Sequence, residues 1–255
     1  MKSLRVGLCF DAGVFTRKEF SKFFRSLDVV LFPELVDGGY AALYNGAAAL
    51  PLHDPFIEHF RKASKTFSLT CIAGSIHLLS RKFRSTNTAL VFSSGRLLHR
   101  YDKIHLFKPT LDHKYFSRGK TARTFSLTSG SLRLKAGIVI CYDLRFPELI
   151  RMLALQGIQI LFVPARWPKA RDDAWQTLLK ARAIENQIFV VGCNALGSEG
   201  GYSYAFDPLG TMIFSNRTQP RLNVGKFRID LHKLATARRH HRNIRDAVLL
   251  RAKKP

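Results

Sequence analysis

The chain has few cysteines, and their spacing argues against two kinds of site. Its 255 residues contain Cys9, Cys71, Cys141 and Cys193, which lie far apart in the sequence. None forms a Cys-x-x-Cys pair or takes the Cys/His spacing of a zinc site, so no metal is expected. A disulfide framework is typical of small secreted domains and is not expected in a chain this long. We infer a reducing, cytoplasmic compartment.

Long apolar runs, repeats and linkers are also missing from the sequence. No run reaches the ~18 apolar residues that a membrane span needs, so no membrane partner is expected. The apolar segment at residues 4–10 is short and is followed by Asp11, which indicates a first strand rather than a signal peptide. No Pro/Gly/Ser-rich stretch divides the chain. We therefore expect a single domain spanning residues 1–255.

Acidic residues are scarce, with 18 Asp and Glu against 41 Lys and Arg, giving a formal net charge of +23. Such a charge can indicate affinity for nucleic acid or for an anionic membrane. The excess is spread along the chain and rises at the end, where Asp246 is the only acid after Arg238. No nucleic-acid-binding motif accompanies it. A solvated basic surface is the preferred interpretation, and salt-sensitive binding of polyanions is the minority alternative.

Apolar segments bounded by turn residues predict alternating strands and helices. Strands are expected at residues 4–10, 29–32, 69–78, 88–92, 96–101, 132–140, 158–163, 188–194, 202–206, 212–214 and 224–229. Helices are expected at residues 16–27, 55–67, 147–156 and 173–187, with Asp54 as the N-cap of the second and short helices or a loop at 107–120. Alternation followed by hairpins predicts mixed sheets with helices outside, an α/β arrangement.

Cys141 has the most informative surroundings in the sequence. A β-branched apolar run leads into it, and Pro147 followed by Glu148 is typical of the first turn of a helix. The thiol is therefore expected on a sharp turn close to a helix N-terminus, where backbone N–H groups and the helix dipole lower a thiol pKa. Cys141 is the candidate nucleophile. The alternative is a buried structural thiol.

Two further segments place charged groups just past strand ends. Glu34 follows the strand at 29–32, and Lys103 follows the strand pair 88–101. A thiol that attacks a carbonyl carbon needs a base and a group that stabilises the oxyanion. Burial would raise the pKa of a glutamate and suit it to the role of base. The alternatives are a surface glutamate and a solvated lysine.

With these residues in place, the sequence resembles the nitrilase, or carbon–nitrogen hydrolase, superfamily, whose catalytic triad is Glu-Lys-Cys. The matching residues are Glu34, Lys103 and Cys141. The resemblance covers nearly the whole chain and extends to residues 87–92, 141–149, 181–187, 207–210 and 229–231. It implies a four-layer α-β-β-α sandwich, a homodimer or higher homo-oligomer formed through helix faces, and no cofactor.

The resemblance also implies roles for individual residues. Glu34 would be the general base, and Lys103 with the backbone N–H of Tyr142 would stabilise the oxyanion. Asp112 stands where many relatives have a second glutamate that positions the lysine and the substrate. Aspartate keeps the charge but is one methylene shorter, so its geometry can differ. The alternative is an ordinary loop aspartate.

The residues around Cys141 and the segment 103–119 look most like the omega-amidase branch. That branch hydrolyses monoamides of short dicarboxylates to a carboxylate and ammonia through a thioester. An N-carbamoyl or aliphatic amide hydrolase of the same superfamily is the first alternative. A basic, non-enzymatic scaffold that binds nucleic acid is the alternative from a different class.

Three residues near Cys141 are candidates for substrate binding. Arg145 could bind a distal carboxylate through a bidentate pair. The alternative is a structural ion pair with Asp143, Glu148 or Glu185. Trp167 is expected as a wall of the pocket. Arg166 replaces an asparagine that relatives often have, and it would favour acidic substrates if it faces the pocket.

Overall fold

The computed structural model describes residues 3–13, 20–80, 85–218, 223–240 and 243–246. The first part of the helix expected at 16–27 and much of the basic C-terminal run fall outside these ranges. No helix in the described ranges is both long and apolar enough to cross a membrane.

One mixed sheet is formed by strands from the N-terminal half of the chain together with the last strand, β13. Its strand order is β13-β1-β2-β3-β5-β4. Strands β3 and β4 pair with successive parts of β5, and β6 pairs with its opposite edge. The strands are β1 (Ser3–Cys9), β2 (Val29–Leu31), β3 (Thr70–Ile72), β4 (Ile76–Leu79), β5 (Ser85–Ser93), β6 (Arg96–Asp102) and β13 (Val224–Asp230). Strands β1, β2 and β3 are parallel, so their carboxyl ends meet at one edge.

A second mixed sheet has the order β12-β11-β10-β9-β8-β7. Its strands are β7 (Phe125–Ser129), β8 (Leu132–Ile138), β9 (Ile160–Ala165), β10 (Phe189–Asn194), β11 (Tyr204–Phe206) and β12 (Met212–Ser215). Strands β8, β9 and β10 are parallel, and antiparallel strands flank them on both sides. This sheet carries the C-terminal half of the site described below.

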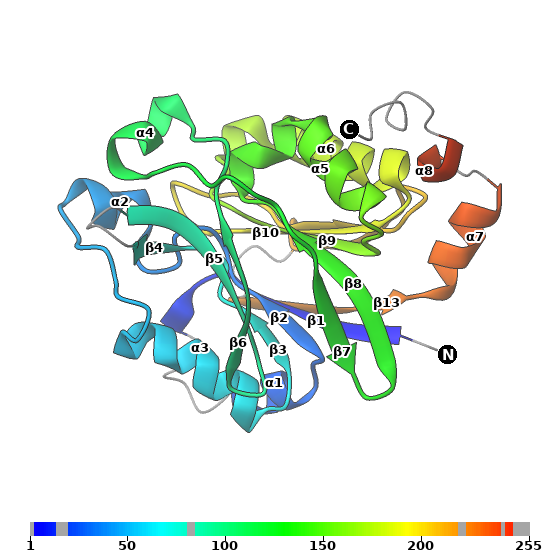
Figure 1. The fold of residues 1–255 in the computed structure, drawn as a ribbon, viewed down its shortest axis with the longest axis horizontal. Helices are drawn as coiled ribbons and strands as arrows, with labels where there is room; N and C mark the ends of the chain where they lie inside the picture. The colour runs from blue at the N-terminus through cyan, green and yellow to red at the C-terminus, as the bar shows by residue number, and fades with distance from the viewer. Residues whose placement is uncertain (1–2, 14–19, 81–84, 219–222, 241–242, 247–255) are drawn as a thin grey trace.

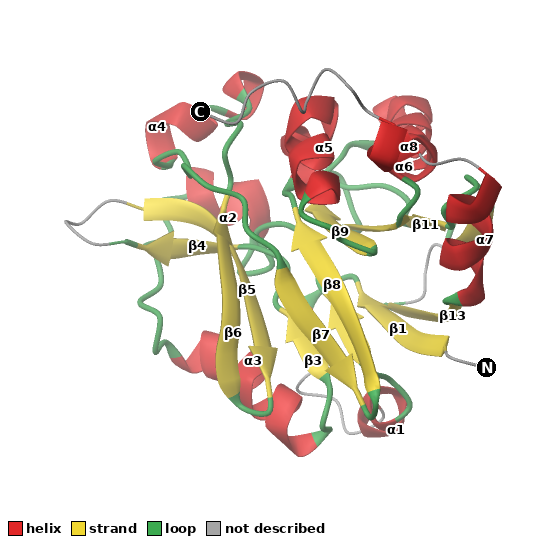
Figure 2. Cartoon of the chain, turned by 45° about the vertical axis from the view of Figure 1, so that its right-hand side comes forward, coloured by secondary structure: helices red, strands yellow, loops and turns green. Residues whose placement is uncertain are grey.

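Helices cover the outer faces of both sheets, which gives the predicted α-β-β-α order of layers (Figure 1). Helices α5 (Pro147–Leu155) and α6 (Asp172–Asn186) cover the second sheet, and α1 (Phe20–Arg25) and α3 (Pro55–Thr66) cover the first. The turned view in Figure 2 shows both sheets between these helices. The remaining helices are α2 (Gly39–Tyr44), α4 (Asp112–Tyr115), α7 (His232–His240) and α8 (Asn243–Asp246).

Strand β2 shows why the layers form. Its residues and Phe32, which follows it, alternate between two apolar cores: Val29 and Leu31 join the core between the sheets, while Val30 and Phe32 join the core beneath α1 and α3. Both faces of the strand are therefore buried, which is why its sequence is continuously apolar rather than alternating. A strand buried in this way fixes the position of whatever follows it, here Glu34.

The expected strand at 69–78 is wrong as a single element. The structure divides it into β3 and β4 at Gly74, whose φ is 52°. A Cβ at Gly74 would lie 1.9 Å from the carbonyl oxygen of Pro33, so the chain passes too close to the Glu34 loop for any larger residue. The predicted cap of α3 is confirmed, because the Asp54 side chain accepts a hydrogen bond from the Phe56 N–H at 2.8 Å.

Candidate active site

Strand ends from both sheets supply polar residues that line one cavity or, in the case of Glu34, bind a lining residue directly. Glu34 follows β2 and Lys103 follows β6 in the first sheet, whereas Cys141 follows β8, Arg166 follows β9 and Glu199 follows β10 in the second. The cavity has a volume of about 270 Å³. Its lining residues are Tyr40, Tyr44, Lys103, Phe107, Thr110, Cys141, Tyr142, Arg145, Arg166, Trp167, Pro168, Arg171, Ser198 and Glu199.

A buried lysine joins two buried carboxylates at the floor of this cavity. Lys103 Nζ lies 2.7 Å from Glu34 Oε1 and 2.8 Å from Asp112 Oδ2, and all three side chains are excluded from solvent. Burial alone would lower the pKa of Lys103, but Glu34 and Asp112 outweigh it and leave the pKa raised. Lys103 is therefore a fixed positive charge in a site of low dielectric.

Asp112 is held by four donors. It accepts from Lys103, from the Phe107 N–H at 3.0 Å, from the Thr110 hydroxyl at 2.7 Å and from the Tyr40 phenol at 2.9 Å. Burial raises its pKa, but Lys103 and these donors outweigh burial and lower it. The shorter aspartate, the first residue of α4, thus still reaches the lysine, with 2.8 Å between Asp112 Oδ2 and Lys103 Nζ.

Glu34 is fully buried, as the apolar run before it predicts. Its Oε1 accepts from Lys103 and from the Asn87 amide at 2.9 Å, with the Tyr40 phenol at 3.4 Å. Its Oε2 accepts from the Arg166 N–H at 3.0 Å. One carboxylate oxygen thus binds the lysine, while the other binds the backbone of Arg166, which follows β9 in the second sheet.

Cys141 lies on a tight turn with φ at 45°, a left-handed value that costs a non-glycine residue about 1–2 kcal/mol. The turn is a 3₁₀ segment, Cys141–Arg145, and α5 begins only at Pro147. The expectation of a lowered thiol pKa is wrong. Burial raises the pKa of Cys141 well above its usual value, and Glu34 raises it further although Lys103 opposes this. Burial and Glu34 therefore both favour the protonated thiol.

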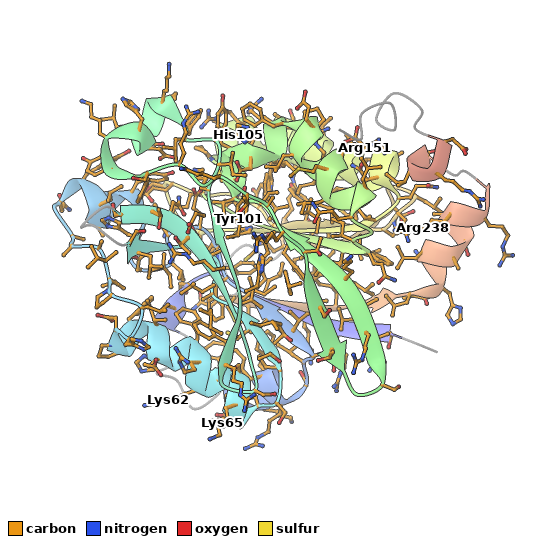
Figure 3. All side chains as sticks on the ribbon, in the orientation of Figure 1. Lys62, Lys65, Tyr101, His105, Arg151 and Arg238 are labelled. Carbon is orange, nitrogen blue, oxygen red and sulfur yellow. The ribbon has the colours of Figure 1, made fainter. Side chains whose placement is uncertain are left out.

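Asp143 fixes the turn that carries the thiol. Its carboxylate accepts from the Ile140 N–H at 3.0 Å, from the Tyr101 phenol at 2.7 Å and from the His105 N–H at 2.8 Å. Figure 3 labels Tyr101, which belongs to β6, and His105, which follows that strand. From α6, Arg182 donates to the Leu144 carbonyl at 3.1 Å, so this helix supports the turn that carries the thiol.

Arg145 and Trp167 both line the cavity, in line with the sequence prediction. The Arg145 guanidinium lies 4.9 Å from the centre of the Trp167 ring. Within the described residues Arg145 forms no ion pair with Asp143, Glu148 or Glu185, which was the structural alternative; Asp143 instead binds Tyr101 and His105, and Glu185 binds Arg182. Its exposed guanidinium remains available to a ligand.

Arg166 faces the cavity, but its guanidinium is already bound. It donates to the carbonyls of Glu34 at 2.8 Å and Leu35 at 2.9 Å, and to Glu199 at 2.9 Å. The neighbouring carboxylate balances its charge. Arg166 thus organises the Glu34 loop and adds little net charge for an acidic substrate.

Sequence reasoning missed Tyr40, Asn87, Arg171 and Glu199. Arg171 lines the cavity with its guanidinium 5.4 Å from the centre of the Phe107 ring, and its carbonyl accepts from the Trp167 indole at 2.9 Å. Tyr40 lies in the short helix α2 and Glu199 in a loop, and neither has a motif around it, so only the folded chain reveals them. Asn87 could have been suspected, because it is a polar residue at the start of an apolar strand. Within the described residues no group of His, Cys, Asp or Glu could hold a metal ion.

A family model described as carbon-nitrogen hydrolase matches residues 18–239. The chain is 37% identical over 196 residues to a hydrolase in the agr operon of Staphylococcus lugdunensis, covering 74% of this chain and 82% of that one. It is 32% identical over 216 residues to a 2-oxoglutaramate amidase of Bacillus subtilis (strain 168), covering 83% and 81%.

One further relative by sequence and one solved structure also resemble the chain. The chain is 36% identical over 192 residues to the omega-amidase YafV of Escherichia coli (strain K12), covering 73% of this chain and 71% of that one. Its fold superposes with a TM-score of 0.81 and 26% identity on XC1258 of Xanthomonas campestris, a CN-hydrolase superfamily protein with an arsenic adduct in its active site. That match covers 97% of this chain and 98% of the other.

Proposed function

Because the chain belongs to the carbon–nitrogen hydrolase family and is a hydrolase of non-peptide carbon–nitrogen bonds, we propose that Cys141 is its nucleophile and Glu34 its general base. The carrying observation is the buried Lys103 between Glu34 and Asp112, beside Cys141 in one cavity. Two buried carboxylates that share a buried cation have no structural need for a neighbouring thiol. Placed together they suit acyl transfer.

In the first half of the proposed reaction, Sγ of Cys141 attacks the amide carbonyl carbon while its proton passes to Glu34. Attack and proton transfer are coupled because the thiol pKa is raised, so little thiolate exists beforehand. The oxyanion is stabilised by Lys103 and by the backbone N–H of Tyr142. The C–N bond then breaks, Glu34 returns the proton to the nitrogen, and ammonia leaves a thioester.

In the second half, Glu34 takes a proton from water as the water oxygen attacks the thioester carbon. Collapse of that intermediate expels the Cys141 sulfur, which recovers the proton from Glu34, and the carboxylic acid is released. Asp112 touches no reacting atom. Its role is to hold the Lys103 ammonium in place throughout the reaction. No cofactor takes part in these steps.

We further propose that the substrates are monoamides of short dicarboxylates, as in the omega-amidase branch. The two relatives named for 2-oxoglutaramate and omega-amide hydrolysis support this. The cavity supports it too, because Arg145 and Arg171 present exposed guanidinium groups at its rim and form no ion pair within the described residues. A distal carboxylate would bind there while the amide reaches Cys141.

The test is ammonia release from a panel of amides. Each monoamide of a four- or five-carbon dicarboxylate is paired with an amide of equal length that lacks the distal carboxylate. We expect the acid member of each pair to be hydrolysed with kcat/KM at least about tenfold higher, since a charged hydrogen-bonded pair contributes about 1.5–3 kcal/mol. Cys141→Ala serves as the inactive control, and intact-protein mass reports the acyl adduct.

Equal rates within each pair would contradict the dicarboxylate proposal and leave the amidase assignment in place. Faster release from N-carbamoyl or neutral aliphatic amides would support the first alternative instead. Retention on DNA at physiological salt without any amidase activity would favour the basic scaffold.

We also propose a homodimer through the α5 and α6 face. Met152, Leu155, Ile184 and Leu209 are each 42–52% exposed there, and α5 packs against α6. Apolar side chains gathered on one face favour a partner surface. A particle mass near one chain in light scattering would contradict this proposal.

A single catalytic domain and a cytoplasmic location complete the proposal. The four cysteines are free and buried, which suits a reducing compartment. The positive surface is proposed to be a solvated one.

A further inference from the structure

Glu199 makes three hydrogen bonds that no catalytic role assigned above explains. It lies in the loop between β10 and β11 at the edge of the cavity. Its carboxylate accepts from the Arg166 guanidinium at 2.9 Å, from the Tyr40 N–H at 3.1 Å and from the Ala41 N–H at 2.8 Å. One loop of the second sheet is thereby tied to two separate pieces of the active site.

The first of these ties leads to Glu34. Arg166 is held by Glu199 on one side and by the carbonyls of Glu34 and Leu35 on the other. Leu35 has φ at 45°, a strained value for a leucine, so the loop after Glu34 needs external support. The Arg166 N–H also donates to Glu34 Oε2. Arg166 thus fixes both the backbone and one carboxylate oxygen of the proposed base.

The second tie leads to the lysine site. Tyr40 and Ala41 lie in the first turn of α2, where backbone N–H groups have no partner within the helix. No side chain of α2 itself caps these groups, so Glu199 takes that role from 159 residues away. The Tyr40 phenol then donates to Asp112, which holds Lys103. Burial and the nearby Glu34 raise the pKa of Tyr40, so it stays a neutral donor.

The Arg166–Glu199 ion pair packs tightly against the start of α2. Gly39 has φ at 73°, and a Cβ there would lie 2.5 Å from both the Arg166 guanidinium carbon and Glu199 Oε2. The ion pair therefore presses directly against the α2 backbone. Both partners are mostly shielded, with side-chain exposures of 14% for Arg166 and 26% for Glu199, so the pair is stronger than one on the open surface.

We propose that Glu199 is a positioning residue: it holds Glu34 through Arg166 and holds Asp112 and Lys103 through Tyr40, and so sets the geometry of the triad. It touches no reacting atom. The proposal deepens the proposed function and rests on it for its kinetic effects. It extends the active site to a residue of the second sheet that acts on the carboxylates of the first.

The test compares Glu199→Gln and Glu199→Ala with Glu58→Gln, which breaks an equivalent arginine–glutamate pair on α3, far from the cavity. Two quantities are measured: amidase kcat and KM, and the rate at which iodoacetamide alkylates Cys141, followed by intact-protein mass. The alkylation rate needs no amide substrate. It still reports on Glu34 if the proposed function fails.

We expect kcat to fall by about 10- to 100-fold in the two Glu199 variants with KM changed less than threefold, because displacement of a catalytic group by about 1 Å costs that much. The alkylation rate should fall in parallel, and Glu58→Gln should match the wild type in both. Glu199→Gln keeps the size and one acceptor of the side chain, so it stays folded if Glu199→Ala does not.

A double-mutant cycle separates positioning from general stability. If Glu199 acts through Arg166, adding Glu199→Gln to Arg166→Lys should cost much less than it costs in the wild type. Additive losses, or wild-type kcat and alkylation rates in Glu199→Gln, would overturn the proposal. So would a rise in KM alone, which would make Glu199 a substrate contact.

Discussion

The floor of the cavity and its rim hold their charges in opposite ways. At the floor, Lys103, Glu34 and Asp112 are shut away from solvent and bind one another at 2.7–2.8 Å. At the rim, Arg145 and Arg171 are exposed, lie over aromatic rings and pair with no acid in the described residues. A buried charge must be paired inside the protein. An exposed guanidinium is hydrated by water and needs no partner in the protein, so it is free to bind a ligand. The floor therefore suits the chemical step, and the rim suits selection of the substrate.

The strongest way to break this comparison is to remove the cation at the floor. Lys103→Met should leave two carboxylates buried together, so we expect loss of activity by at least about 1,000-fold and a loss of stability of about 3–5 kcal/mol. Kinetics and thermal unfolding would measure the two effects. Lys62→Met on the outer surface of α3 is the matched control (Figure 3), and it should change neither. A stable, active Lys103→Met protein would show that the floor needs no cation.

Asp112 tests how closely the floor is fitted. Its carboxylate is fully buried and already meets four donors, so Asp112→Glu has no room for the added methylene. We expect that variant to lose about 1–3 kcal/mol of stability through overpacking. It should also lose activity. Asp112→Asn keeps the size and should stay closer to wild-type stability while kcat falls, because Lys103 then has one counter-charge. Higher kcat in Asp112→Glu would mean that aspartate is a poor substitute at this position.

The rim should respond in KM rather than in kcat. Arg145→Ala and Arg171→Ala should each raise KM for a dicarboxylate monoamide by about tenfold, since each removes one charge-assisted bond. The KM for a neutral amide should stay within about twofold. Lys65→Ala, a cation on the far side of the molecule, is the control (Figure 3). High salt should weaken the same preference, because exposed charges are screened. A large fall in kcat with KM unchanged would place these arginines in the chemical step.

Asp37, three residues after Glu34, gives the smallest effect and a pH dependence. Burial raises its pKa to about 6, and its Oδ1 has no partner within the described residues. Because the pKa of Asp37 is higher in the folded protein than in the unfolded chain, ionisation of this carboxyl destabilises the native state. The free energy of unfolding should therefore fall as pH rises from about 4 through 6. Asp37→Asn should then be more stable above pH 6 by at most about 3 kcal/mol. Unfolding at pH 4 and pH 8 would measure this.

The control for that measurement is Asp173→Asn at the start of α6, where the side chain is exposed. It should show no gain in stability at pH 8. An Asp37→Asn protein that is no more stable at pH 8 than at pH 4, relative to wild type, would contradict the prediction.

The layers and the central residues of the site followed from local patterns. The β-branched run before Cys141, the apolar run before Glu34 and the strand pair before Lys103 each determine a strand, and each functional residue follows directly. The antiparallel strand β7 and the helices α2 and α7 were not predicted, since their segments have weak periodicity. Strand β4 was not separated from β3, because the break depends on how closely Gly74 approaches Pro33.

Side-chain partners were harder to predict than elements. The sequence places Arg166 in the pocket wall, but only its bonds to Glu34, Leu35 and Glu199 show that its charge is already balanced. A helix start near Cys141 indicates a lowered thiol pKa, and burial beside Glu34 reverses that sign. Both errors arise because a partner distant in sequence outweighs the nearest neighbours in space.

By itself the sequence determined most of the strands, the functional residues that follow them and which family the chain belongs to, because periodicity and short motifs are local properties. Only the tertiary structure decided that the Lys103 cluster is buried and that Arg145 has no acidic partner within the described residues. It also decided that Glu199 binds Arg166 and the backbone N–H of Tyr40. These features depend on distances between residues up to 159 positions apart. Such distances are set by packing the two sheets together, since burial makes each charge depend on whatever folds against it.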